Sequence, residues 1–135
     1  MPAEILEKEQ LSKGVFRMVL SGPKIARKRK AGQFVVIRIH EEGERIPLTI
    51  ADADPGKGTI TIVYQIVGKS TRHLADLNVG DTLLDLVGPL GKPTHVENFG
   101  TVACIGGGIG IAPVYPITQA MRDAAGKNGK LLMIG

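Results

Sequence analysis

The chain has 135 residues, 43% of them hydrophobic, which is enough for one ordinary domain or for one domain and part of a second. Its apolar runs are far shorter than a membrane span and no secretion signal opens it, so we expect a cytoplasmic protein without a membrane segment. The single cysteine, Cys104, excludes an internal disulfide and a four-cysteine iron–sulfur or metal site within these residues, and its apolar surroundings predict a buried, inert thiol.

The net charge is +4, and five of the seven residues from Lys24 to Lys30 are basic. We interpret this run as a solvated turn between two strands. The alternative is a contact for an acidic partner or for nucleic acid. Only five aromatic residues are spread along the chain, which argues against a base-stacking surface and makes nucleic acid the weaker alternative.

The first hundred residues consist of short β-rich runs separated by clusters of Gly, Pro, Ser and Asp. Pro47 indicates an edge or a bulge rather than a central strand. Residues 71–77 are compatible with one or two helical turns. Many short strands with frequent turns are typical of a small β-barrel or sandwich. Six strands are predicted in this part, over residues 5–11, 15–20, 33–39, 46–51, 59–67 and 82–87.

The pattern changes near Asn98. After it, the sequence predicts a strand over 101–105, a glycine loop, a helix over 114–125 and a strand over 131–134. This is the start of an α/β domain with a parallel sheet. We therefore expect a β domain over residues 1–98 and the first part of a nucleotide-binding domain over residues 99–135. A doubly wound domain needs several more strands, so either the chain is a fragment or another copy covers the open surface, and we expect a fragment.

The glycine loop is the strongest functional signal in the sequence. A strand, a glycine turn and a helix aim backbone N–H groups and a positive helix end at a phosphate. Pro113 suits the first helical position. The loop is not the usual dinucleotide fingerprint, because Pro113 or Ile111 replaces its third glycine. The alternative is a turn without a ligand, but four glycines followed by Ala112 and Pro113 favour a nucleotide site.

Two segments of the β domain are further candidates for binding. In the first, a strand ends at Gly68 and a short helix begins near Ser70 or Thr71, so that backbone N–H groups, Lys69 and two hydroxyls converge. This suits a diphosphate, and the alternative is an ordinary capped helix start. In the second segment, the Thr49 hydroxyl follows a rigid proline and can bond a flat heterocycle.

Together the motifs RIPLTIAD, VGKSTRHL, GPLGKP and GGGIGIAPVYPI, in this order and spacing, resemble the ferredoxin–NADP reductase superfamily. Within it the chain is most similar to the small subunits of sulfide dehydrogenase and of the NADH-dependent ferredoxin:NADP oxidoreductase. The electron-transfer subunit of dihydroorotate dehydrogenase is a near relative. The resemblance covers the whole chain. It implies a six-stranded antiparallel Greek-key barrel that binds flavin, followed by an NAD(P)-binding domain, with FAD between them.

The resemblance also assigns site residues. It implies that the flavin ring contacts Pro47, Leu48, Thr49, Val63, Tyr64 and Gln65, and that Thr49 forms a hydrogen bond near the redox-active nitrogen. The residues implied to bind the diphosphate are Gly68, Lys69, Ser70 and Thr71. Those implied to bind the nicotinamide nucleotide are Gly106, Gly107, Gly108, Ile109, Gly110, Ala112 and Pro113. Arg45 is a further cofactor candidate, although it stands one residue before the family's arginine position, and a one-residue shift reverses the face of a strand.

The implied function is electron transfer between NADH or NADPH, FAD and an iron–sulfur centre or ferredoxin. The resemblance implies a larger flavoprotein or iron–sulfur subunit as partner, and the relatives carry a cysteine cluster that has no counterpart here. No side chain is needed as an acid or base, and we expect His40, His73 and His95 at the surface, with His73 close enough to the diphosphate loop to touch a phosphate. The alternative is a non-enzymatic β-barrel module that binds RNA or an acidic protein through its basic turn.

Overall fold

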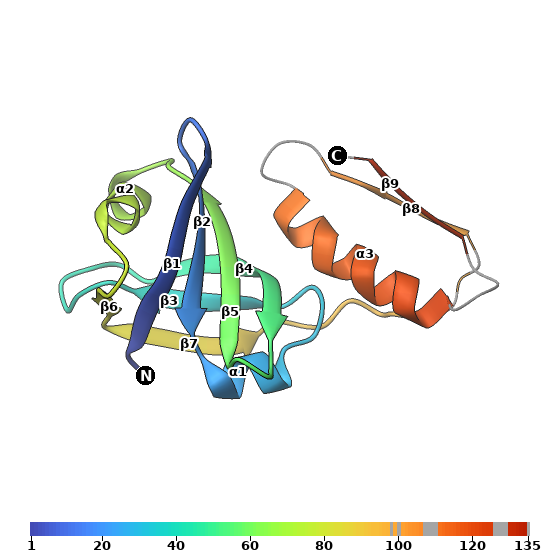
Figure 1. Cartoon of the computed structure of the whole chain (residues 1–135), viewed down its shortest axis with the longest axis horizontal. Coiled ribbons are helices and arrows are strands. Elements are labelled where there is room, and N and C mark those ends of the chain that lie inside the picture. Colours follow the sequence, from blue (N-terminus) through green and yellow to red (C-terminus); the bar gives the residue numbers. More distant parts are fainter. Residues whose placement is uncertain (98, 100, 107–110, 126–129, 135) are drawn as a thin grey trace.

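The computed structural model describes residues 1–97, 99, 101–106, 111–125 and 130–134. A β-barrel is followed along the chain by a smaller α/β unit (Figure 1). The barrel part comprises β1 (Ala3–Ser12), β2 (Val15–Ser21), α1 (Pro23–Lys28), β3 (Phe34–Arg38), β4 (Ile46–Asp54), β5 (Thr59–Gln65), α2 (Lys69–Asp76), β6 (Thr82–Leu83) and β7 (Asp85–Leu90). The α/β unit comprises β8 (Thr101–Ile105), α3 (Ile111–Ala125) and β9 (Lys130–Ile134).

The strands of the barrel form one antiparallel sheet in the order β6-β1-β2-β5-β4-β3-β7. Strands β3, β4 and β5 are consecutive neighbours and β2 returns beside β5, which is a Greek-key arrangement. The edge strands β6 and β7 are separated along the chain only by Leu84, so the chain itself joins the two sheet edges and closes the barrel. The predicted sixth strand is thus one strand broken at Leu84, and the expected barrel is confirmed.

Alternating side chains fill the barrel. On β5, Ile60, Ile62 and Tyr64 are buried, whereas the residues between them are partly exposed. On β3, Val35 and Ile37 are fully buried in the same cluster. Each aliphatic side chain of this size stabilises the folded state by about 1.5–3 kcal/mol when fully buried. The barrel interior therefore holds in place the outward-facing and edge residues that form the site.

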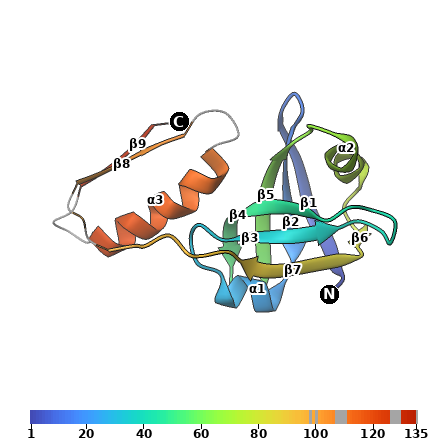
Figure 2. The same ribbon diagram turned by 180° about the vertical axis from the view of Figure 1, so that it is seen from behind.

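The α/β unit has the predicted order of elements. Strands β8 and β9 pair in parallel, from Thr101 opposite Lys130 to Ile105 opposite Ile134, and α3 connects them. Helix α3 contacts β4 as well as β8 and β9, so it lies between the barrel and the parallel pair (Figure 2). Pro113 is the third residue of α3 rather than the first, and it is tolerated there because the first four N–H groups of a helix have no acceptor within it.

The basic run does not form the predicted turn, because residues 23–28 form helix α1. Pro23 suits the first helical position, and lysine and arginine are good helix formers. Ile25 and Ala26 are buried against the barrel and anchor the helix. The prediction was wrong because it considered the charges of the run and overlooked this apolar pair.

Cys104 is buried and forms no disulfide, as expected. Within the described ranges, no helix is both long and apolar enough to cross a membrane. Among the same residues, no group of three or more His, Cys, Asp or Glu side chains is placed to hold a metal ion.

Candidate functional site

Strands β4 and β5 separate over part of their length. Near the turn that joins them they are paired as far as Ile50 opposite Ile62, with a register shift beside Ile50. Beyond this point, residues 46–49 pair only with β3, and residues 63–65 pair only with β2. Backbone N–H and C=O groups that these two segments turn toward each other therefore have no ladder partner, and a backbone group without a partner is available to a ligand.

Pro47 lies in the separated half of β4. It stands opposite Val36 of β3 and has no paired neighbour on its other side. Although β4 lies between two strands in the sheet, it is locally an edge at this residue, and the register shift follows a few residues later. The sequence prediction of an edge or a bulge at Pro47 is confirmed, because proline has no N–H to give to a second neighbour.

The separation of the strands opens a cavity of about 400 Å³, which we call the strand cavity. Its walls come from β4, β5, the loop after β5, α2 and α3. Eight of its lining residues are ones that the sequence assigned to the flavin, its diphosphate or the nicotinamide nucleotide: Pro47, Leu48, Thr49, Val63, Tyr64, Gln65, Thr71 and Pro113. Segments that are up to 66 positions apart in the sequence, from Pro47 to Pro113, thus meet at one place.

The sequence did not single out Ile46 and Val67, which also line the strand cavity. Val67 is 78% exposed, which is high for a large apolar side chain next to a buried strand. An apolar side chain left at the rim of a cavity favours a flat, partly apolar ligand. The signal was present in the sequence, because Val67 extends the apolar run of β5 immediately before the glycine.

Thr71 holds the first turn of α2 in place. Its hydroxyl accepts hydrogen bonds from the N–H groups of Val67 at 2.9 Å and Gly68 at 3.1 Å, and it donates to the Gly68 carbonyl at 3.2 Å. The first N–H bonded within the helix is that of Arg72, to the Gly68 carbonyl at 3.0 Å. The N–H groups of the three residues before Arg72 therefore point out of the helix end, which is the arrangement that binds phosphate.

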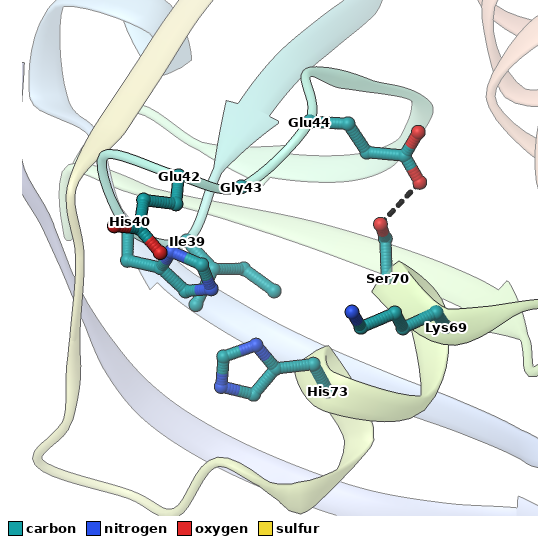
Figure 3. Close-up of a pocket in the computed structure, with 8 residues that line it drawn as sticks. All are labelled: Ile39, His40, Glu42, Gly43, Glu44, Lys69, Ser70 and His73. Atoms are coloured by element: carbon teal, nitrogen blue, oxygen red, sulfur yellow. Dashed lines mark hydrogen bonds between the residues drawn. The ribbon is translucent and has the colours of Figure 1, made fainter.

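A second cavity of about 340 Å³, the loop cavity, lies between α2 and the loop from Ile39 to Glu44 (Figure 3). Lys69, Ser70 and His73 line it, and they occupy a different face of α2 from Thr71 because successive helical residues are about 100° apart. The Lys69 ammonium points into the cavity (Figure 3). The first turn of α2 therefore stands between the strand cavity and the loop cavity.

Two contacts organise the loop cavity. The Ser70 hydroxyl donates a hydrogen bond to the Glu44 carboxylate, which places a negative charge beside the end of α2 (Figure 3). The imidazoles of His40 and His73 lie with their ring centres 5.1 Å apart. His40 is exposed and His73 is half-buried, so His73 is less accessible than the sequence suggested, and it lies beside the diphosphate loop as expected.

Tyr64 brings a buried phenol to the wall of the strand cavity. Its side chain is 2% exposed, it stacks on Phe16 at 6.0 Å between ring centres, and its hydroxyl has no hydrogen-bond partner among the described residues. Burial, and next the charge of Asp76, raises the pKa of Tyr64 above its usual range. The phenol therefore stays neutral and acts as an apolar support for β5.

Arg45 lies outside both cavities. It precedes β4, and its guanidinium is 3.6 Å from a carboxylate oxygen of Asp85 on β7. The pKa of Asp85 is lowered, mainly by the hydrogen bond from the amino-terminal ammonium and to a smaller extent by Arg45. The structure thus pairs Arg45 with an acid on the neighbouring part of the barrel.

The predicted nucleotide loop is described only at its ends. Gly106 follows β8 and is half-buried, Ala112 belongs to the first turn of α3, and Pro113 lines the strand cavity. Gly107, Gly108, Ile109 and Gly110 lie outside the described residues.

The sequence of this chain is similar to a known protein family and to known electron transfer subunits. The profile of the family described as oxidoreductase FAD-binding domain matches residues 2–95. A "dihydroorotate dehydrogenase B (NAD(+)), electron transfer subunit homolog" of Thermotoga maritima is 48% identical over 121 residues, which make up 90% of this chain and 43% of that protein. The corresponding electron transfer subunit of Fusobacterium nucleatum is 34% identical over 119 residues, with 84% of this chain and 46% of that protein covered.

Solved structures agree with this result. The structure reported for an NADH-dependent reduced ferredoxin-NADP oxidoreductase superposes with a TM-score of 0.92 at 45% identity, over 96% of this chain and 46% of that one. A ferredoxin reductase in carbazole 1,9a-dioxygenase shares the fold, with a TM-score of 0.84 at 24% identity, over 100% of this chain and 43% of that one. The chain spans less than half the length of each of these relatives.

Proposed function

Since this chain belongs to the oxidoreductase FAD-binding domain family, we propose that it holds the FAD of an electron-transfer flavoprotein that NADH or NADPH reduces. Electrons pass onward from the flavin to an iron–sulfur centre or a ferredoxin. The similarity to an electron transfer subunit and to an NADH-dependent ferredoxin-NADP oxidoreductase supports this role. The observation that carries the proposal is the strand cavity, because it brings together residues of separate segments that were assigned to FAD, with Pro113 from the nicotinamide-nucleotide loop beside them.

The strand cavity has the chemistry that a flavin ring requires. The ring system is flat, apolar at one end and rich in hydrogen-bonding atoms at the other. Pro47, Leu48 and Val63 provide apolar walls, and the unpaired backbone edges of β4 and β5 provide donors and acceptors. Thr49 adds a half-buried hydroxyl on the same wall. The residues present therefore fit the flavin, and we assign its ring to this cavity.

The rest of the cofactor would follow α2. The end of α2 offers free N–H groups and Lys69 to a diphosphate, and the loop cavity beyond it has room for a further group. FMN has a single phosphate and would leave the loop cavity without a ligand. Two cavities on either side of one phosphate-binding turn therefore support FAD rather than FMN.

Bound FAD supplies the hydride and single-electron chemistry, and this chain binds and orients it. Pro47 and Leu48 exclude water from one side of the cavity, and Thr71 keeps the loop at Gly68 in the shape that presents its N–H groups. The phenol of Tyr64 is neutral and has no place in proton transfer. No acid or base from the described residues is needed, because hydride transfer depends on distance and alignment.

The activity of the whole protein goes beyond this chain. We propose that residues 1–98 form the FAD domain and that residues 99–135 begin the NAD(P) domain, with Gly106 to Pro113 at the nicotinamide nucleotide. We also propose a partner subunit that carries flavin or iron–sulfur centres, which the names of the relatives support. We further propose a cytoplasmic location, because nicotinamide nucleotides are oxidised and reduced inside the cell.

The test begins with the purified full-length protein that contains this chain. Heating should release a yellow cofactor that chromatography identifies as FAD, and anaerobic mixing with NADH or NADPH should bleach its absorbance. FMN as the sole cofactor would contradict the assignment of α2 and the loop cavity. A colourless protein that gains no flavin on incubation with FAD would contradict the whole proposal and favour the non-enzymatic binding module.

A further inference from the structure

Strand β1 contains a lysine whose surroundings differ from those of an ordinary surface lysine. Lys8 is half-buried, whereas Glu7 and Glu9 on either side of it are exposed. Among the described residues, no ion pair involves Lys8. Taking a charge out of water is costly, so a half-buried ammonium without a carboxylate needs other partners for its three N–H donors.

The partners of Lys8 lie at the carboxyl end of α2. Its ammonium donates hydrogen bonds to the Ala75 carbonyl at 2.5 Å and to the carbonyl of Leu77, just after the helix, at 2.8 Å. The last carbonyls of a helix have no partner within it and form the negative end of its dipole, so an ammonium satisfies both their bonding and their charge. The same ammonium lies 5.4 Å from the centre of the Phe16 ring, within cation–π range.

Lys8 provides a kind of attachment that the other contacts of α2 do not. The hydroxyl of Thr71 bonds the loop that precedes α2, and that of Ser70 bonds Glu44 in the loop cavity. Leu74 is fully buried in the barrel core, but an apolar contact has no preferred direction. Among the described residues, the hydrogen bonds that join a barrel strand to the end of α2 come from Lys8, so this side chain fixes the direction of the helix.

The Phe16 ring connects Lys8 to the strand cavity. Phe16 stands opposite Tyr64 where β2 pairs with β5, and the two rings stack with their centres 6.0 Å apart. Tyr64 in turn lines the strand cavity. Lys8 therefore contacts both the helix that we assign to the diphosphate and the ring that supports the wall assigned to the flavin.

The direction of α2 matters for a ligand that occupies both places at once. The eight residues of α2 span about 12 Å, and Lys8 holds the end opposite to the one with the free N–H groups. A helix that tilts about the buried Leu74 moves its two ends in opposite directions. A displacement of about 0.5 Å already takes a hydrogen bond out of its normal range of lengths. A small tilt of α2 would therefore weaken its bonds to a diphosphate whose flavin ring stays in the strand cavity.

We propose that Lys8 is a positioning residue for FAD, because its ammonium fixes α2 relative to the wall of the strand cavity. This inference rests on the proposed function for the identity of the ligand, and on the contacts of Lys8 for the role of this side chain. Lys8 lines neither the strand cavity nor the loop cavity, so it acts through α2 and does not touch the cofactor. Its loss should weaken the binding of FAD but not that of riboflavin, which has no phosphate for α2 to bind.

The experiment titrates the full-length protein, freed of its flavin, with FAD and separately with riboflavin. Lys8→Met keeps an apolar stem beside Phe16 and removes the N–H donors. If α2 is then in its binding orientation for between a third and a tenth of the time, the dissociation constant of FAD rises about three- to tenfold, and that of riboflavin stays the same. Lys8→Arg keeps a cation with several donors and should restore most of the affinity for FAD. Lys13→Met, in the exposed turn between β1 and β2, is the matched control and should bind both flavins like the unchanged protein.

An unchanged affinity of Lys8→Met for FAD would overturn the proposal. So would an equal loss of affinity for FAD and riboflavin, because Lys8 would then stabilise the barrel as a whole rather than position α2. An effect of Lys13→Met as large as that of Lys8→Met would also overturn it, because the loss would then follow from the charge of the chain. Absence of FAD binding in the unchanged protein would contradict the proposed function and this inference with it, whereas the other outcomes concern Lys8 alone.

Discussion

Replacement of Thr71 by valine tests how the first turn of α2 is held. Valine keeps the shape of the side chain but removes the hydroxyl that accepts the N–H groups of Val67 and Gly68. A buried donor without a partner costs about 1–3 kcal/mol. Val67 and Gly68 are exposed, so water replaces part of each bond, and we expect the free energy of unfolding to fall by about 1–2 kcal/mol.

Thermal unfolding of the flavin-free protein, followed by circular dichroism, measures this loss without contributions from the cofactor. In a chain of this size about 1 kcal/mol shifts the melting temperature by about 3–5 °C, so Thr71→Val should melt about 3–10 °C lower. Affinity for FAD should fall as well, because the N–H groups at Gly68 lose their fixed positions.

Two controls sharpen the comparison. Thr71→Ser keeps a hydroxyl in place and should restore most of the stability. Ser70→Ala removes a hydroxyl that bonds Glu44 and should leave the melting temperature close to that of the unchanged protein. A Thr71→Val variant that melts normally but binds FAD weakly would refute the reasoning, because the hydroxyl would then be a ligand of the cofactor rather than a part of the loop.

Three further substitutions test the walls of the two cavities. Thr49→Val should leave a polar flavin atom unpaired at a cost of about 1–3 kcal/mol and shift the flavin spectrum or redox potential with the fold intact, and an unchanged potential and affinity would count against it. Tyr64→Phe should cost no stability at neutral pH, because the hydroxyl has no partner. Burial raises the pKa of Tyr64, so the unfolded chain loses its phenolic proton near pH 10 before the folded chain does. The free energy of unfolding should therefore fall above about pH 10 in the unchanged protein, and it should fall less in Tyr64→Phe. Unfolding curves measured at alkaline pH would show the difference. Glu44→Gln should lower the FAD dissociation constant about two- to fivefold by removing a negative charge beside α2, whereas Glu42→Gln, on the same cavity without the bond to Ser70, should change it less. Equal effects in isothermal titration would show that Glu44 does not compete with the diphosphate.

The sequence predicted the strands well because their signals are local. Alternation of apolar residues and turn clusters defines β5 and β2 within one or two residues. The break at Leu84 was not predictable, because it depends on where the two edges of the sheet meet. Helix α1 was missed although Pro23 marked its start, because a short helix depends on two buried residues whose burial only the closed barrel creates.

For the site as well, local patterns were predictable and features that depend on how distant segments meet were not. Motif resemblance assigned eight of the ten residues that line the strand cavity. Pro47 indicated an edge at one position, but no local pattern indicates that residues 46–49 and 63–65 part from each other over their whole length. The separation depends on how the strands pair along the sheet. Residues 46–49 stay paired with β3 and residues 63–65 stay paired with β2, but the two segments do not pair with each other. The contact of Glu44 with Ser70 is likewise a product of loop placement, 26 positions apart in the sequence.

A binding site built from the edges of two separating strands makes an unusual demand on the sequence. Its hydrogen-bonding groups belong to the backbone, so most side chains there can change as long as the strands stay apart. The site requires the residues that prevent β4 from pairing with β5. Pro47 prevents this pairing directly, because it has no N–H to donate to a neighbouring strand. Residues that shape the backbone, such as Pro47 and Thr71, should therefore tolerate substitution less than Leu48 or Val63, which only line the walls.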